Sequence, residues 1–295
     1  MKKILFPLTV IVVALLFFSG CQGHKSDIQT KIYAFADSTE YAHVSVSAEL
    51  PVSYKGIDEQ ILHVLHQALD ERLSRITSFE TQRFFMPYNG DLSDNDAFMG
   101  YYFDEVMKFL GGLSRQDAED RVKYIAENEE LSEELKAELL ATVPYWEYEY
   151  QLSKIEESPK YVVFKALDYL YMGGAHGGTG FGYMTFSKRD GHLILPFLDS
   201  AFEEDMQPLL LEGLGRYLVE NGETVEGEDI FGQLFLDDNH IPLPASQPYP
   251  AKEGLVFTYM QNEIGPYSLG MPSFTVPYEK VAPYLTSDAR RSLGL

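Results

Sequence analysis

The feature that most constrains this chain is a strict alternation of apolar and polar residues in two distant segments. In His43–Leu50 every second residue from Val44 onward is apolar, and the residues between them are polar. The segment Tyr145–Ile155 repeats this pattern from Trp146 onward. Because successive side chains of a strand point to opposite faces, the period predicts two strands that are buried on one face only. Such strands need a covering layer.

Apolar residues at helical spacing supply that layer. In Ile57–Ile76 they recur three or four positions apart, which predicts a helix of roughly 30 Å. Residues 79–144 are acidic, helix-prone pieces, in which Ser114 and Ser132 are the expected N-caps. We interpret residues 79–144 as a helical insertion that packs on the domain and ends at Pro144.

The second half of the chain is predicted to be mainly strand. Further strands are expected at Lys160–Met172, Tyr183–Ser187, Leu193–Phe197, Gly254–Met260 and Ser273–Tyr278. Asp190-Gly191 is a hairpin signal between the second and third of these. A terminal helix is expected over Val281–Leu293.

A further helix is predicted to end near Val219, and its start has two readings. Ser200 with Glu203 resembles a capping box, but that start would place Pro208 in the helix interior. We prefer Asp205 as the cap, because Pro208 then falls in the first turn, where it is tolerated.

The order of these elements predicts an α+β fold, with antiparallel sheets and helices packed on one side. The chain has 295 residues, which is enough for two modest domains. We expect an N-terminal α+β module over residues 41–182, which contains the helical insertion, and a C-terminal α+β module over residues 183–295.

The N-terminus reads as a targeting segment. Two lysines precede the apolar run Ile4–Phe18, which would reach roughly 22 Å as a helix, short of the ~30 Å core of a bilayer. Ser19-Gly20-Cys21 follows and looks like a bacterial lipobox. We predict a signal peptide over residues 1–20, a lipid anchor on Cys21 and a tether over residues 21–40. The protein would then lie outside the cytoplasm, held to a bacterial membrane, the outer one in a cell that has two.

Composition limits the partners. There are 45 acidic against 23 basic side chains, a formal net charge of -22, which argues against nucleic acid. Three acidic clusters, at residues 127–130, 203–205 and 226–229, are either solvated surface or the source of a negative field that attracts cationic partners. Cys21 is the only cysteine, so an internal disulfide and a thiol-based metal cluster are excluded.

The glycine-rich segment Gly173–Gly180 is the most conspicuous candidate site. Glycine suits a tight loop between strands, because it tolerates positive φ and close backbone approach. The segment lacks the Lys-Ser/Thr ending of a phosphate loop and the spacing of a dinucleotide motif. It is either an architectural turn or a backbone-lined binding edge that presents His176.

Asp168 and His176 are the candidates for catalysis. Asp168 falls on the more apolar face of its strand, where a carboxylate needs a partner or stays protonated. With His176 it would give a hydrolase, and His192 could join either residue at a metal. No spacing matches a metal motif, the pair His63 and His66 lacks the Glu of HExxH, and no serine lies in GxSxG. We therefore expect no catalysis, no metal and no cofactor.

Three motifs in order resemble one family of bacterial exported domains. They are Val143-Pro144-Tyr145-Trp146-Glu147, then Gly173-Gly174-Ala175-His176, then a C-terminal run through Gly254-Leu255-Val256-Phe257, Glu263 to Gly270 and Phe274 to Tyr278. The order is similar to the GGAH-containing domains in the extracytoplasmic part of the anti-sigma factor RsiV and the N-terminal region of the peptidoglycan deacetylase PdaC. The resemblance spans roughly residues 41–286, but Gln261-Asn262 replaces the usual Pro-Tyr before Glu263.

The resemblance to RsiV implies a non-catalytic module that binds a lysozyme-like protein. Such lysozymes are basic, opposite in sign to this chain. The sequence offers no sigma-binding segment, spanning helix or deacetylase domain, so we expect binding without signalling. The expected recognition edge joins Gly173, Gly174, His176 and Gly177 to the loop at Pro266 and Tyr267. The alternatives are a module that binds peptidoglycan or another glycan through the same loops, and a hydrolase that uses Asp168 and His176.

Overall fold

The α+β class is confirmed by the computed structural model, which describes residues 27–76, 83–142, 145–222, 230–236 and 240–295. Within these ranges the chain forms one five-stranded and one three-stranded sheet. The strands are β1 Thr30–Ser38, β2 Ala42–Pro51, β3 Trp146–Glu157, β4 Tyr161–Tyr171, β5 Gly178–Ser187, β6 Tyr249–Pro250, β7 Gly254–Thr258 and β8 Ser273–Pro277. The helices are α1 Ile57–Leu73, α2 Asn95–Glu127, α3 Glu133–Ala141, α4 Glu203–Glu220, α5 Tyr278–Val281 and α6 Ser287–Leu293. The predicted signal peptide and Cys21 lie outside the described residues.

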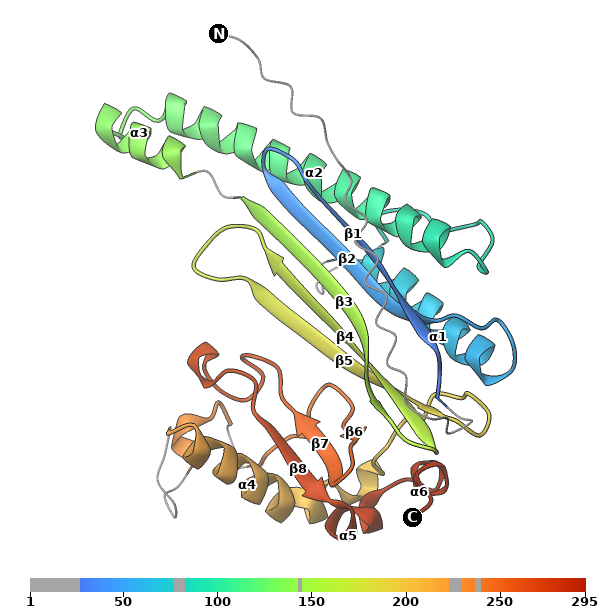
Figure 1. The fold of residues 1–295 in the computed structure, drawn as a ribbon. Coiled ribbons are helices and arrows are strands. Elements are labelled where there is room, and N and C mark those ends of the chain that lie inside the picture. The colour runs from blue at the N-terminus through green and yellow to red at the C-terminus, as the bar shows by residue number, and fades with distance from the viewer. Residues whose placement is uncertain (1–26, 77–82, 143–144, 223–229, 237–239) are drawn as a thin grey trace.

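The five-stranded sheet has the order β1-β2-β3-β4-β5, and α1 and α2 cover one of its faces (Figure 1). Three of its pairs are antiparallel, but β2 and β3 are parallel, so the expectation of wholly antiparallel strands is wrong at this pair. The reason is the connection. After β2 the chain passes through three helices and returns to the end from which β2 began, and such a crossover produces parallel strands.

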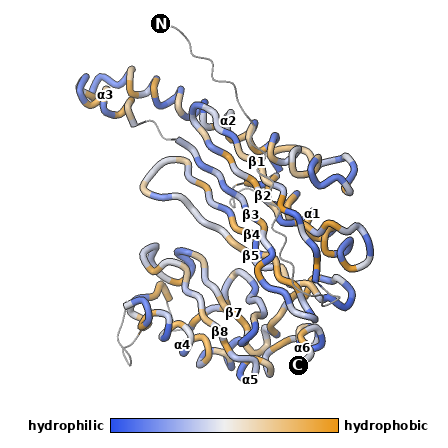
Figure 2. Tube along the Cα trace, viewed as in Figure 1, coloured by the Kyte–Doolittle hydropathy of each residue, from blue (hydrophilic) through white to orange (hydrophobic). Residues whose placement is uncertain are grey.

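Strict alternation predicted the buried face correctly. Val44, Val46 and Ala48 in β2 are fully buried, as are Tyr148 and Leu152 in β3 to within 1 %. They pack with apolar side chains of α1 and α2 in one core. Hydrophobic and hydrophilic residues are interleaved along these strands (Figure 2), as expected where only one face is covered.

Strand β1 corrects the predicted tether. Residues 21–26 lie outside the described part of the chain, but Thr30–Ser38 pairs with β2 along its whole length. Its Tyr33 and Phe35 pack against the core, opposite Ala48 and Val46. Because β1 is an edge strand, it is held by its backbone pairing with β2 and by the packing of these two aromatic side chains. The segment therefore looked polar in sequence and still folds.

The helical insertion is confirmed, but in two helices rather than several short pieces. Helix α2 is 33 residues long and is capped by Asp94, whose side chain accepts the Ala97 N–H. The expected cap Ser114 is wrong: it lies inside α2, and its hydroxyl donates to the Gly111 carbonyl instead. Ser132 is confirmed as the cap of α3, since its hydroxyl accepts the Leu135 N–H. Residues 79–82 and 143–144 lie outside the described ranges.

The C-terminal lobe, which begins at Asp199, places α4 against the three-stranded sheet. Helix α4 starts at Glu203 after a 3₁₀ turn over Ser200–Phe202, so the preferred cap Asp205 is wrong and Pro208 lies inside the helix. The turn is capped by Asp199, which supplies the start signal that Asp205 was expected to give.

Two other C-terminal expectations are corrected. Leu193–Phe197 is not a strand and makes only the bridge Phe186↔Leu193, because Pro196 has no N–H to continue the ladder. The terminal helix is split into α5, a 3₁₀ turn at Ala282–Tyr284, and α6.

The expected module boundary after residue 182 falls inside β5, so the structure does not divide there. Val162 and Phe164 of β4 belong to the core under α1 and α2, whereas Tyr161 and Val163 belong to the core of the C-terminal lobe. The C-terminal lobe lies at this end of the sheet (Figure 1). The two cores therefore share one strand.

Two glycines of α4 give a matched stability test. A Cβ at Gly213 would lie 2.1 Å from the ring of buried Phe274. A Cβ at Gly215 would have no neighbouring atom of the described residues within 4 Å. We expect Gly213→Ala to lower the free energy of unfolding by about 1–3 kcal/mol through overpacking. Gly215→Ala should raise it by about 0.5–1 kcal/mol, because alanine favours the helix. Urea denaturation measures both, and equal effects would contradict this packing.

A second prediction concerns His192, whose Nδ1 lies 2.5 Å from Asp190 and whose Nε2 lies 2.9 Å from Asp288 of α6. Partial burial alone would lower its pKa, but the two carboxylates outweigh it and raise the pKa. The histidine should therefore contribute stability below about pH 6.5 and lose it as pH rises through the raised pKa. His192→Gln should reduce the difference in urea stability between about pH 6 and pH 8.5, and His63→Gln should not. An unchanged difference in His192→Gln would contradict the contact.

Candidate binding site at the edge of the five-stranded sheet

The predicted glycine loop is shorter than expected, because Gly178, Thr179 and Gly180 belong to strand β5. The remaining turn has positive φ at Gly173 (93°) and Gly174 (109°), which only glycine adopts without strain. Tyr171 closes the turn by donating its hydroxyl to the Gly174 carbonyl at 3.1 Å. A Cβ at Gly177 would lie 2.4 Å from the Tyr169 ring, so a larger residue there would displace this ring. The architectural reading is therefore well supported.

The two predicted loops meet. The His176 ring stacks on Tyr267, with 4.0 Å between centroids and 21° between planes. Pro266 and Tyr267 begin a 3₁₀ turn of the C-terminal lobe, so the stack joins that lobe to the end of β4. Pro266, however, lines a separate cavity of about 320 Å³ with Phe235 and Leu269, not the one that borders Gly173 and His176. The six candidate residues therefore surround a contact between lobes rather than one cleft.

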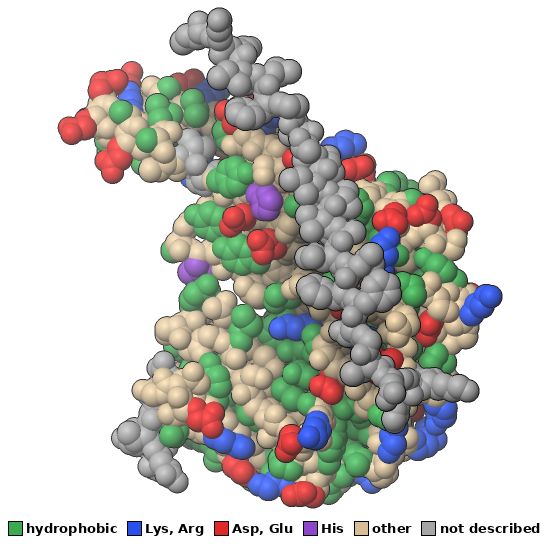
Figure 3. Space-filling model, in the orientation of Figure 1, with side chains coloured by type: hydrophobic (Ala, Val, Ile, Leu, Met, Phe, Trp, Pro, Cys, Tyr) green, Lys and Arg blue, Asp and Glu red, His purple; other side chains and the backbone are tan. Residues whose placement is uncertain are grey.

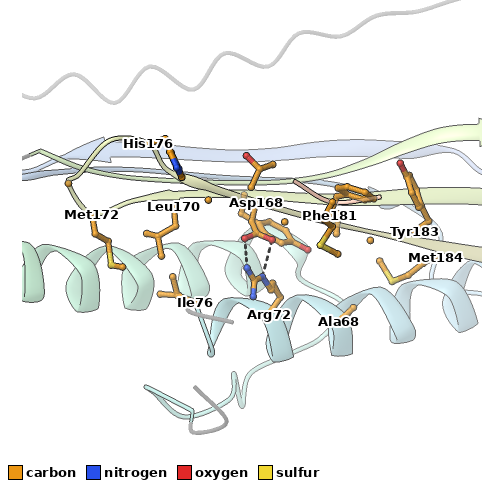
Figure 4. Close-up of a pocket in the computed structure, with 18 residues that line it drawn as sticks. Ala68, Arg72, Ile76, Asp168, Leu170, Met172, His176, Phe181, Tyr183 and Met184 are labelled. Atoms are coloured by element: carbon orange, nitrogen blue, oxygen red, sulfur yellow. Dashed lines mark hydrogen bonds and ion pairs between the residues drawn. The ribbon is translucent and has the colours of Figure 1, made fainter. Parts of the chain in front are cut away.

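A larger cavity of about 700 Å³ lies along β5, and we call it the edge groove. Strand β5 lines it with residues 178–184, which include Met184, and β4 lines it with Ala166 and Leu170 (Figure 4). Ala68 of α1 and Met260 of the C-terminal lobe complete the apolar wall. The groove is open because β5 presents glycine to it. No atom lies within 4 Å of a Cβ built on Gly178 or Gly182.

One ion pair lies in the wall of the edge groove. Arg72 of α1 reaches Asp168 of β4 with two guanidinium nitrogens, of which Nε lies 3.1 Å from Oδ1. Asp168 is 9 % exposed, so its charge needs this partner. Burial opposes the charge on Arg72, but hydrogen bonding and the charge of Asp168 outweigh burial and raise its pKa. The expectation that Asp168 needs a partner is confirmed.

No pattern in the sequence identified Arg72 as that partner. The sequence held one sign of this role: a charged residue at position 72 lies beside Leu69 and Leu73, which belong to the buried apolar stripe of the helix. The partner carboxylate is 96 residues away in sequence, which no local pattern reveals.

Asp168 and His176 do not form an acid–base pair in the structure. Asp168 points toward α1 and Arg72, whereas His176 lies level with the strands, away from α1 (Figure 4). The His176 Nδ1 lies 3.2 Å from the Gly177 carbonyl. Both residues line the edge groove, but no hydrogen bond joins them in the described part of the chain.

The other candidate histidines are dispersed. His66 is buried, with its Nε2 2.8 Å from Asn95, and burial lowers its pKa. His63 bonds Gln67, and His192 lies between two carboxylates near α6. Across the described ranges, no three His, Cys, Asp or Glu side chains come together in an arrangement that could hold a metal ion.

The face of β3 and β4 that points away from α1 and α2 carries acidic and aromatic residues. Glu147 lies directly opposite Tyr171, and Glu149 lies directly opposite Tyr169. We call these four residues the acidic–aromatic face. Neither glutamate pairs with a cation among the residues that the structure describes. Figure 3 shows acidic and hydrophobic side chains together on this side of the sheet, above a hollow that borders the C-terminal lobe.

The rim of the acidic–aromatic face continues into the C-terminal lobe. Slight burial raises the pKa of Tyr169, and the nearby Glu147, Tyr267 and Tyr171 raise it further. Tyr267 is 37 % exposed. The Tyr169 hydroxyl therefore stays protonated at neutral pH. The face offers carboxylates and phenol rings to a partner.

Comparison with known proteins supports the fold. Residues 199–279 match the model of the family described as "Protein of unknown function (DUF3298)". A DUF3298 family protein from Pseudomonas aeruginosa PAO1 is 16% identical, with a TM-score of 0.54 over 90% of this chain and 97% of that one. A DUF3298 member from Bacteroides fragilis NCTC 9343 is 15% identical, with a TM-score of 0.60 over 90% of this chain and 96% of that one. No curated protein matches the chain.

Both solved structures share the arrangement of nearly the whole chain, including the part before residue 199. At this identity they show the fold alone. Every helix in the described ranges is too short or too polar to cross a bilayer.

The Arg72–Asp168 pair gives a test of the groove wall. Asp168→Asn should cost about 2–4 kcal/mol of stability, because it leaves a largely buried guanidinium without its counter-charge. The double variant Arg72→Met with Asp168→Leu should recover most of that loss, since neither charge remains. Glu71→Gln, which breaks the exposed pair with Arg75, should cost less than about 1 kcal/mol and is the control. Additive effects of the two groove substitutions in a double-mutant cycle would contradict the pairing.

Proposed function

We propose that this protein is a lipid-anchored binding protein of the bacterial envelope that holds a basic, lysozyme-like protein and catalyses no reaction. The observation that carries the proposal is the acidic–aromatic face. Two glutamates lie on one strand, each opposite a tyrosine, and no described cation neutralises either of them. Unpaired carboxylates beside aromatic rings suit the arginine and lysine side chains of a basic partner.

Charge supports the same partner. The formal net charge of -22 would attract a basic protein over a distance and raise its association rate. The stack of His176 on Tyr267 lies at the rim of the face, where the C-terminal lobe begins. The predicted loop residues therefore border the proposed surface rather than form it alone.

The proposed location depends on the sequence. The apolar run Ile4–Phe18 and the Ser19-Gly20-Cys21 pattern support export and acylation at Cys21. The resemblance to the extracytoplasmic part of RsiV supports both the envelope location and a lysozyme-like partner. The anchor would hold the acidic surface at a bacterial membrane, where a lytic enzyme acts on the cell wall.

A peptidoglycan ligand is the second candidate, because Tyr169, Tyr171 and Tyr267 could stack on sugar rings. The two ligands differ in their response to salt. Binding to a basic protein should weaken as salt rises, whereas stacking on neutral sugars is screened little. Retention of the protein on purified peptidoglycan in high salt would favour the glycan.

The test uses the full chain in detergent and a C-type lysozyme, with binding measured by calorimetry at low and high salt. The variant Glu147→Lys with Glu149→Lys should weaken binding by about tenfold or more, because it reverses the charge of the face. Glu129→Lys with Glu130→Lys, in the exposed turn between α2 and α3, changes the net charge equally and should weaken binding by less than about threefold.

Two outcomes would contradict the proposal. The first is undetectable binding of lysozyme at low salt. The second is an equal loss in both double variants, which would mean that net charge acts without contact at the acidic–aromatic face.

A further inference from the structure

Strand β5 has an unpaired edge, and its backbone geometry shows which groups are free. The N–H of Ser187 donates to the His192 carbonyl, and the Thr185 carbonyl accepts the Ile194 N–H. Both groups point away from β4. Backbone groups alternate between the two sides of a strand, and the register of β4 with β5 has no shift. The N–H and C=O groups of Thr179, Phe181 and Tyr183 therefore also point away from β4.

These six backbone groups have no partner among the described residues. Pairing on this side of β5 ends with the contacts of Thr185 and Ser187, and the chain beyond Ile194 leaves the strand. The Tyr183 side chain contacts the C-terminal lobe, where its ring lies at a tilt against Tyr249 and its hydroxyl reaches Thr258.

The edge groove lies along this edge. Its lining includes every residue from Gly178 to Met184. Glycine at alternate positions exposes the backbone of this run to the cavity, which therefore follows the strand next to its unpaired groups. Seven residues at about 3.3 Å each give an open edge of roughly 20 Å, the length of an ordinary strand.

Natural sheets usually protect such an edge with lysine, proline or a bulge. Strand β1, at the other edge of the same sheet, carries Lys31 and Asp37. The stretch Gly178–Met184 contains no charge, proline or register shift. Instead it has glycine at alternate positions. Asp168 occupies the space beside Gly180, but Gly178 and Gly182 leave room on the α1 side for the side chains of another strand.

We propose that β5 binds an extended segment of a partner protein as a sixth strand, with alternate apolar side chains of that segment in the edge groove. This inference rests on the proposed function, because it takes the ligand to be a protein. It adds how that protein would be bound. Main-chain hydrogen bonds would give affinity, and the groove would select the side chains.

The opposite side of the edge indicates a charge preference. The Lys165 Nζ lies 5.5 Å from the Phe181 ring centroid and 5.9 Å from that of Tyr183. No carboxylate pairs with it in the described ranges. The added strand should therefore carry an acidic residue among those that face away from α1.

The probe is a synthetic peptide of about nine residues that alternates valine and threonine, with glutamate at the central threonine position. Its binding to the full chain is measured by calorimetry, and amide exchange is followed by NMR at Thr179, Phe181 and Tyr183. We expect exchange at these three amides to slow by about tenfold or more on binding. The same peptide with every amide N-methylated has similar side chains and no donors, and it should not bind.

Two further comparisons test the groove and the charge. Gly182→Val fills open space on the α1 side without touching the free amides, and should weaken peptide binding by about tenfold or more. Gly112→Ala, at an open glycine of α2, should leave binding unchanged. Replacement of the peptide's glutamate with lysine should weaken binding.

The outcomes separate this inference from the proposed function. Lysozyme binding without any protection of the three amides by the peptide would overturn the strand addition and leave the function standing. Peptide binding with protection, but no lysozyme binding, would do the reverse. Protection already present in the free chain and growing with its concentration would also overturn the inference, because β5 would then pair with a second copy.

Discussion

The structure depends on the burial of the first half of β4 on both faces. Val162, Val163 and Phe164 are fully buried, and Tyr161 is 7 % exposed. Two of these side chains point into the core under α1 and α2, and the other two point into the core of the C-terminal lobe. A strand that is apolar on both faces needs a covering layer on each. The C-terminal lobe is that second layer, so it completes the sheet rather than following it as a separate unit.

This arrangement stabilises one end of the sheet and leaves the other end open. The last residues of β5, from Thr185 to Ser187, are buried and paired, whereas Gly178 at its start is exposed. An open strand edge is a hazard, because it can pair with other chains. The well-packed end of β4 and β5 can hold the strand in place, so that the glycine-rich end does not need its own packing to remain extended. The two-sided core thus makes an accessible edge compatible with a stable fold.

Sequence patterns predicted the elements whose burial is one-sided and regular. The alternation in β2 and β3 has one solution, because a shift by one residue would expose every apolar side chain. The pattern failed where another constraint decided the structure. Strand β1 has few large apolar residues because it lies at an edge, and Ser114 is internal because α2 continues past it.

The candidate site shows the same division. A turn at Gly173 and its meeting with the Tyr267 loop were predictable, because both places carry loop residues and belong to one ordered set of motifs. The edge groove was not. It depends on Arg72 reaching Asp168 across 96 residues and on three glycines entering β5, which local propensity disfavours and the pairing with β4 imposes.

The acidic–aromatic face and the edge groove border β4 from opposite faces of the sheet. Tyr169 belongs to the acidic–aromatic face, while its neighbour Asp168 points into the edge groove. One partner could therefore place its body on the open face and an extended segment along β5. The contributions would differ physically. Contacts to Glu147 and Glu149 are charged and screened by salt, whereas a strand addition uses mainly neutral backbone groups, with Lys165 as its one charged contact. Because Arg72 neutralises Asp168, this ion pair gives the edge groove no net charge that would attract or repel the bound segment. Salt should then govern how fast such a partner arrives more strongly than how long its segment stays bound.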